Sequence, residues 1–362
     1  MVWSSLPLIP STRSALVALL IVSATVSLCG CAKLAYYGQA VSGQWQLLQS
    51  RRAVEDVLSD ADTSPKLRQR LQIAWALRDF ASTELALPDN GSYRDYADLQ
   101  RAFVVRNVFV TPPLSLEPHQ WCFPLVGCVT YRGYFNADAA ERFAKTLRDQ
   151  GNDVYVANVP AYSTLGWFDD PLLNTFVYWP IGRLAELMFH ELAHQRLFIP
   201  NDTIFNESFA TAVGRLGAQL WLVRHGTQAD RENYELQQHR RETFLKLVLS
   251  TRDVLAELYN SSASNADKQA GKYRELRQLK ARYQALKQTV WNGYAGYDAW
   301  FNEDLNNAKL AALGAYTDYE PAFRKLFEQS RGDFSTFYRA AEALGGLPPE
   351  VREQRLQALL AS

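Results

Sequence analysis

Two histidines separated by three residues are the first feature of this chain that could do chemistry. The stretch HELAH contains His190, Glu191 and His194, and the 362-residue chain has only five histidines. Side chains four residues apart share one face of a helix, so both imidazoles can reach one metal ion, about 2.0–2.1 Å from each ring nitrogen. Glu191 is rotated by about 100° from His190, which suits a general base beside the metal rather than a ligand on it. We therefore expect a catalytic zinc centre.

A catalytic zinc site needs a third protein ligand and one open position. Glu207 follows His194 by 13 residues, in a helix expected to begin near Thr203 after a short turn. Because a short connection makes consecutive helices antiparallel neighbours, we expect Glu207 to face the histidines and complete the site. The alternative is a surface carboxylate, or an ion-pair partner of Arg196 or Arg215.

The three other histidines are weaker ligand candidates. His119, His225 and His239 have no partner at ligand spacing, so each is expected to be solvated or packed. A zinc peptidase also uses a donor to the oxyanion of its tetrahedral intermediate, commonly a tyrosine or a histidine from elsewhere in the chain. Tyr316 is the first candidate for this donor, and Tyr319 is the second.

Prolines bracket the helix that would carry the two histidines. Pro180 precedes residues 181–199 and Pro200 follows them, as expected at the two ends of a helix. Within this range four apolar residues recur at helical spacing and are expected to form a buried stripe: Leu184, Leu187, Met188 and Leu192.

Further helices are predicted on both sides of this segment. Upstream, residues 42–60 and 64–87 carry apolar residues at helical spacing and predict two helices packed as a hairpin. Downstream, residues 231–261 and 267–290 predict two long helices separated by a polar break, followed by short helices to the end of the chain.

A small sheet is predicted just upstream of the histidine helix. β-branched and aromatic runs at 102–113, 127–135 and 153–162 are typical of strands, with a helix capped by Asn136 and Gly151 between the last two. The last strand either binds a peptide backbone by edge pairing or is an ordinary core strand. These patterns predict a predominantly helical, zincin-like α+β fold.

The N-terminus has the pattern of an export signal. The apolar run Ala15–Leu28 is too short to span a bilayer comfortably but suits a signal-peptide core. The LCGC that ends at Cys31 resembles the bacterial lipobox, which implies cleavage after residue 30 and acylation of Cys31. Ala32 at the next position implies sorting to the outer membrane of a Gram-negative cell. The alternatives are a plain secretory signal and an uncleaved anchor.

Cysteine usage agrees with export. Cys29 would be lost with the signal, which leaves Cys122 and Cys128 as a pair expected to form a disulfide in an oxidising periplasm. A second metal site is the alternative for this pair.

The chain has 38 basic and 38 acidic residues, so it lacks the electrostatic footprint of a nucleic-acid-binding protein.

These motifs together resemble two related groups of proteins. HELAHQ followed by NESFA is similar to the gluzincin metallopeptidases, whose aminopeptidase branch places its glutamate in an Asn-Glu-x-x-Ala setting, here Asn206, Glu207 and Ala210. The separation from His194 to Glu207 is shorter here, and the Gly-Ala-Met-Glu-Asn motif does not occur. Over most of the mature chain the sequence resembles the predicted aminopeptidase family of bacterial lipoproteins, in the order lipobox, WCFPLVGCVTYRGYF, HELAHQ…NESFA and NNAKLAALGAY.

We therefore expect residues 31–362 to form one domain of a lipid-anchored zinc metallopeptidase that acts on peptides. The resemblance implies an aminopeptidase. One alternative is an envelope endopeptidase or quality-control protease with the same centre, and another is a non-catalytic zinc-binding scaffold. Glu191 speaks against the scaffold, because a purely structural zinc has no use for a base.

Overall fold

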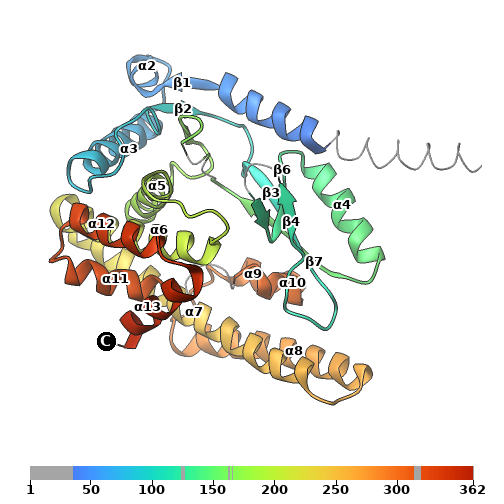
Figure 1. The fold of residues 1–362 in the computed structure, drawn as a ribbon. Coiled ribbons are helices and arrows are strands. Elements are labelled where there is room, and N and C mark those ends of the chain that lie inside the picture. Colours follow the sequence, from blue (N-terminus) through green and yellow to red (C-terminus); the bar gives the residue numbers. More distant parts are fainter. Residues whose placement is uncertain (1–35, 124–126, 162–163, 165, 314–318, 362) are drawn as a thin grey trace, which may run out of the picture.

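Helices make up most of this protein, and small sheets lie beside them (Figure 1). The computed structural model describes residues 36–123, 127–161, 164, 166–313 and 319–361. Their content confirms the prediction of a mostly helical α+β fold. The predicted signal peptide, with Cys29 and Cys31, lies outside the described residues, and its boundary stays a prediction.

The predicted helix over 42–60 is wrong as a single element. A helix over residues 36–49 ends there, strand β1 (Arg51–Ala53) follows, and helix α2 (Val54–Ser59) begins directly after it. β1 pairs with β2 (Asp95–Ala97), which in turn pairs with β8 (Leu172–Leu173). This pairing with distant segments overrides the local helical spacing.

Helix α3 (Pro65–Thr83) forms as predicted. The Ser64 side chain caps it by accepting from the Leu67 N–H, and Pro65 occupies its first turn. α2 packs against α3, and the same apolar core holds Val54 and Val57 of α2 and Leu71 of α3. The predicted hairpin therefore exists, but its first arm is only the short α2.

A second three-stranded sheet confirms the strands predicted at 102–113 and 153–162. Its order is β6 (Tyr131–Tyr134), β3 (Val105–Thr111), β7 (Asp153–Val159), and both pairings are antiparallel. β7 is therefore an edge strand. The run predicted at 127–135 is divided, because its first part forms β5 (Gly127–Val129) in a separate hairpin with β4 (Trp121–Phe123). Cys122 and Cys128 stand opposite each other in that hairpin and are joined by a disulfide.

Side-chain alternation gives the sheet of β6, β3 and β7 two different faces. Helix α4 (Ala137–Asp149) covers one face, where Val108, Val110 and Tyr134 share an apolar cluster with α4 (Figure 1). Asn136 caps α4 by accepting from the Ala139 N–H, and Gly151 follows it with a φ of 85°. On the other face, the ring of Phe109 contacts the rings of Tyr131 and Tyr155 on the two neighbouring strands.

The helices predicted after Pro180 are present, and caps define their limits. The four long ones are α5 (Ile181–Arg196), α6 (Thr203–His225), α7 (Gln228–Asn260) and α8 (Asn265–Thr289). Thr227 and Asp230 form a capping box at the start of α7, and Ser264 caps α8 after the predicted polar break. The shorter helices that follow are α9 (Asp298–Asn302), α10 (Asn307–Ala311), α11 (Glu320–Gln329), α12 (Phe334–Gly345) and α13 (Pro349–Ala361). Among the described helices, none combines the length and the apolar composition needed to cross a membrane.

α5 and α6 approach each other very closely. Gly214 of α6 lies against the backbone of α5, where an added Cβ would stand 2.6 Å from the Glu186 carbonyl oxygen and 3.2 Å from the Cβ of His190. Three residues of the predicted α5 stripe are buried, namely Leu184, Met188 and Leu192. Leu187 is only partly buried, because it lines a cleft instead.

We expect Gly214→Ala to lower the free energy of unfolding by about 1–3 kcal/mol, since the added methyl group overpacks the contact between α5 and α6. Urea unfolding of the purified protein measures this. Gly38→Ala is the matched control, because a Cβ at Gly38 meets no atom within 4 Å. Equal stability of Gly214→Ala and the unchanged protein would contradict the close approach.

Candidate metal centre

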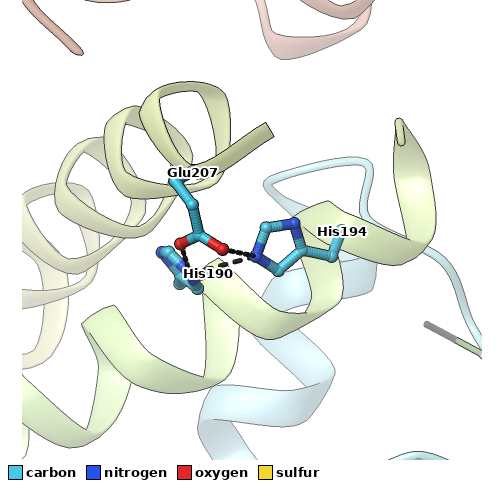
Figure 2. A group of neighbouring side chains, drawn as sticks. All are labelled: His190, His194 and Glu207. Atoms are coloured by element: carbon cyan, nitrogen blue, oxygen red, sulfur yellow. Dashed lines mark hydrogen bonds and ion pairs between the residues drawn. The ribbon is translucent and has the colours of Figure 1, made fainter. Parts of the chain in front are cut away.

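His190, His194 and Glu207 lie together where the end of α5 faces the first turns of α6 (Figure 2). The two histidine Nε2 atoms are 3.1 Å apart. The Glu207 carboxylate oxygens lie 3.4 Å from Nε2 of His190 and 3.7 Å from Nε2 of His194. Among the described residues, these are the only three His, Cys, Asp or Glu side chains whose ligand atoms gather in this way. The structure thus brings together the three residues predicted as ligands.

The turn between α5 and α6 sets the position of Glu207. The Asn206 side chain accepts from the Ile199 N–H at 2.7 Å and donates to the Ile199 C=O at 2.8 Å. Asp202 caps α6 by accepting from the Phe205 N–H, and its carboxylate pairs with Arg352 at 2.7 Å. Asn206 of the NESFA motif therefore fixes the turn, and with it the position of Glu207 opposite the histidines.

The protonation states of His194 and Glu207 favour cation binding. Burial acts to lower the pKa of His190, but its hydrogen bond with Glu207 and the charges of Glu191 and Glu207 outweigh this and raise it, so a binding metal would displace the His190 proton. Burial lowers the pKa of His194 to about 4, and the positive charge of His190 contributes, so the His194 imidazole is neutral at neutral pH. Burial also raises the pKa of Glu207, but its hydrogen bond with His190 and the charges of both histidines outweigh this and hold the pKa below its usual value. A neutral imidazole and an ionised carboxylate are the forms that bind a metal.

The donor set itself fits a metal ion. Two imidazole nitrogens and a carboxylate oxygen point to one region, as expected for ligands of a single ion. Nδ1 of His194 is buried and has no hydrogen-bond partner among the described residues. The Nε2 atom of His194, which faces the cluster, is therefore the only ring nitrogen of this histidine with a polar neighbour in the described structure.

Glu191 stands beside the three predicted ligands and is not part of their cluster. It lines a cleft together with His190, and it does not belong to the group of convergent ligand atoms. Burial raises the pKa of Glu191 to about 7; the His190 charge acts in the opposite direction, and the Glu207 and Asp170 charges add to the rise. A carboxyl group poised near neutral pH beside a metal centre can act as a general base.

The rival histidines lie elsewhere. His119 packs near Trp121, with ring centres 6.1 Å apart, and His225 packs against Trp221 at 4.4 Å. His239 is exposed on α7. All three have the solvated or packed settings expected from the sequence.

The rival partners proposed for Glu207 are engaged with other carboxylates. Arg196 pairs with Glu342, and Arg215 pairs with Glu320 at 3.3 Å. The reading of Glu207 as an ion-pair partner of Arg196 or Arg215 therefore does not hold.

The two tyrosines predicted as oxyanion donors have different outcomes. Tyr316 lies outside the described residues, so its role stays a prediction. The Tyr319 hydroxyl donates to the Glu353 carboxylate at 3.2 Å, on α13. That contact directs it toward a neighbouring helix.

Tyr131 is a candidate oxyanion donor that was not predicted from the sequence. Burial raises its pKa to about 12, and the negative charges of Glu207 and Glu191 contribute to this rise. Its hydroxyl therefore lies within electrostatic range of the metal centre, on the sheet face that α4 does not cover. The alternation of side chains along β6 indicates which residues share a face of the sheet, but the sequence does not show which face is directed toward the candidate centre.

A cleft of about 610 Å³ opens beside the centre, between α5 and α7. We call it the α5–α7 cleft. Residues from 179–191 form one wall of the cleft, and residues from 230–245 form the other. The rest of the lining comes from Tyr294, Gly296, Tyr297 and Leu313. His190 and Glu191 belong to its lining, so a molecule in the cleft would reach the centre directly.

Comparison with known proteins identifies one family. No curated protein and no solved structure matches the chain. Residues 35–356 match the family described as "Putative aminopeptidase", which confirms the resemblance noted in the sequence. Because this match covers nearly all of the described residues, the chain belongs to that aminopeptidase family.

Proposed function

We propose that the protein is a zinc-dependent peptidase of the aminopeptidase type. The observation that carries the proposal is the convergence of His190, His194 and Glu207 beside Glu191, at the end of an open cleft. Membership of the family supports peptide hydrolysis as the reaction class. A structural zinc site would be closed by four protein ligands, whereas three ligands leave one position for chemistry.

The donor set favours zinc over other common ions. Imidazole nitrogens suit Zn²⁺, while Mg²⁺ and Ca²⁺ prefer oxygen ligands. When bound, zinc lowers the pKa of a water molecule toward 7 and polarises a peptide carbonyl. Glu191 would accept the proton of the attacking water on its carboxylate and pass it to the leaving amine. His190, His194 and Glu207 would hold the ion.

The oxyanion donor completes this proposal. A tyrosine hydroxyl can donate to the negative charge that develops on the carbonyl oxygen, provided that it stays protonated. Tyr131 is a candidate for this role, because its hydroxyl is within range of the charges of Glu207 and Glu191. Tyr316 remains the candidate proposed from the sequence.

We also propose that acylated Cys31 anchors the protein at the periplasmic face of the outer membrane. LCGC after an apolar core supports this, and so does the first described helix, over residues 36–49. Tyr37, Val41 and Trp45 lie four residues apart on that helix, and all three are exposed. An exposed apolar stripe a few residues after the anchor suits the surface of a bilayer. The partners in this proposal are the lipid bilayer and a peptide substrate, and nucleic acid is not among them.

We expect Glu191→Gln to keep its zinc and its melting temperature while losing hydrolysis by about 10²–10⁴-fold, because an amide cannot accept the proton. Glu207→Gln should instead lose zinc on dialysis, because a neutral amide is a poor ligand. Zinc content by elemental analysis and cleavage of free and N-blocked peptides measure both effects.

Glu235→Gln is the matched control, since Glu235 is exposed on α7. It should keep both zinc and activity. Loss of zinc from Glu191→Gln as readily as from Glu207→Gln would reverse the assignment of base and ligand. Preferential cleavage of N-blocked peptides would replace the aminopeptidase with an endopeptidase, and no cleavage across a broad panel would favour a scaffold.

We expect Cys31→Ser to leave the precursor uncleaved and unlabelled by fatty acid, because the serine hydroxyl does not replace the thiol in acylation. Metabolic labelling with a radioactive fatty acid measures this. Cys29→Ser is the control and should be labelled like the unchanged protein. Equal labelling of Cys31→Ser would place the anchor elsewhere.

A further inference from the structure

The α5–α7 cleft contains more charged groups than the metal chemistry uses. Besides His190 and Glu191, its lining includes Arg183 and Glu186 from α5. Asp230 and Arg241 come from α7, together with amides and tyrosines. A substrate in the cleft will respond to whichever of these charges is not already neutralised by the protein.

The acidic groups of the lining other than Glu191 are engaged. Glu186 accepts hydrogen bonds from Tyr234 at 2.9 Å, from Gln238 at 2.6 Å and from Arg241 at 2.9 Å. Asp230 accepts from the Thr227 backbone and side chain in the capping box of α7. Neither carboxylate is therefore placed to receive a cation from a substrate.

Arg183 is in the opposite situation. Its guanidinium lies over the Trp179 ring, 3.7 Å from the ring centre, and its side chain is exposed in the cleft. None of the carboxylates that the structure describes comes within 4.0 Å of its nitrogens. Partial burial against the cleft walls lowers the pKa of Arg183, and the positive charge of Arg241 lowers it further, while the negative charge of Glu186 acts in the opposite direction. An arginine that is stacked on an aromatic ring, lacks an acidic partner and lies beside a second arginine is well suited to bind an anion.

The position of Arg183 along α5 sets how far a bound anion lies from the metal centre. It precedes His190 by seven residues, which is about two turns or 10.5 Å along α5, so both residues lie on the same side of that helix. A peptide in extended form advances about 3.3–3.6 Å per residue. The guanidinium of Arg183 lies over Trp179, further from the centre than its own backbone, so a bound anion would lie at least about three residues from a carbonyl at the metal centre.

We propose that Arg183 binds a carboxylate of the substrate in the α5–α7 cleft, and that the preferred substrates are short peptides with a negative charge at least about three residues beyond the cleaved bond. The proposal rests on the proposed function, because the cleaved bond is placed at the metal centre. An aminopeptidase keeps only one residue on the other side of that bond, so the carboxylate belongs to the part that leaves. It comes either from the C-terminus of a tetrapeptide or from an acidic side chain at the fourth residue.

The test measures binding separately from cleavage. Isothermal titration calorimetry uses Glu191→Gln protein, so that no probe is hydrolysed, with and without a second change at Arg183. The probes are tetraalanine, tetraalanine amide and Ala-Ala-Ala-Glu amide. Arg183→Lys keeps the charge, Arg183→Gln removes it, and Arg274→Gln removes an equal charge from an exposed position on α8.

We expect tetraalanine to bind at least about tenfold more tightly than its amide, as a charge-assisted hydrogen bond contributes in other sites. Arg183→Gln should abolish this preference, Arg183→Lys should retain part of it, and Arg274→Gln should leave it unchanged. Tight binding of Ala-Ala-Ala-Glu amide would show that a side-chain carboxylate also serves. Weak binding of that probe would restrict the site to the C-terminus.

Three results would overturn the proposal: equal affinity for tetraalanine and its amide, a preference that survives in Arg183→Gln, and no binding of any probe. Cleavage is measured in parallel with Glu191 intact. Cleavage that does not depend on Arg183 would leave the peptidase standing and remove the carboxylate site. Binding that depends on Arg183, without any cleavage, would support the carboxylate site and contradict the proposed peptidase function.

Discussion

The close contact between α5 and α6 is the constraint on which the rest of the site depends. Each ligand group alone is an ordinary side chain, and only the antiparallel packing brings the Glu207 carboxylate within 4 Å of both imidazoles. Gly214 permits that approach because it has no side chain to hold the helices apart. Asn206 fixes the turn that joins them. Backbone geometry in α5 and α6 therefore decides whether the centre exists.

α5 also organises the chemistry along its own length. It carries Arg183 near its start, Glu186 one turn later, and His190, Glu191 and His194 near its end. The partly buried Glu186 accepts from three side chains of α7, and it therefore fixes α5 against the opposite wall of the cleft. A substrate lying along this helix would meet a cationic position at one end and the metal ligands at the other. Specificity and catalysis would then be set by one rigid element.

The core of the site could be predicted from the sequence because it follows from local geometry. The spacing of His190 and His194 determines that they share a helix face, and a short turn determines that Glu207 faces them. The break of the first helix at β1 could not be predicted, because the strand exists only through pairing with β2, more than forty residues further on. Tyr131 and Arg183 were missed for a related reason, since their relation to the centre depends on how separate elements pack. The assignment of Tyr316 rests on residues that the structure does not describe.

The central claim is that two histidines of α5 and one glutamate of α6 hold a single zinc ion with an open position. X-ray absorption spectroscopy at the zinc edge, on the purified and zinc-loaded protein, tests it most directly. The account predicts only nitrogen and oxygen neighbours at about 2.0–2.2 Å, with the outer scattering of two imidazoles and no sulfur. It also predicts that this imidazole scattering disappears in His190→Ala/His194→Ala protein. Sulfur at about 2.3 Å, or the same spectrum from that double variant, would contradict the account.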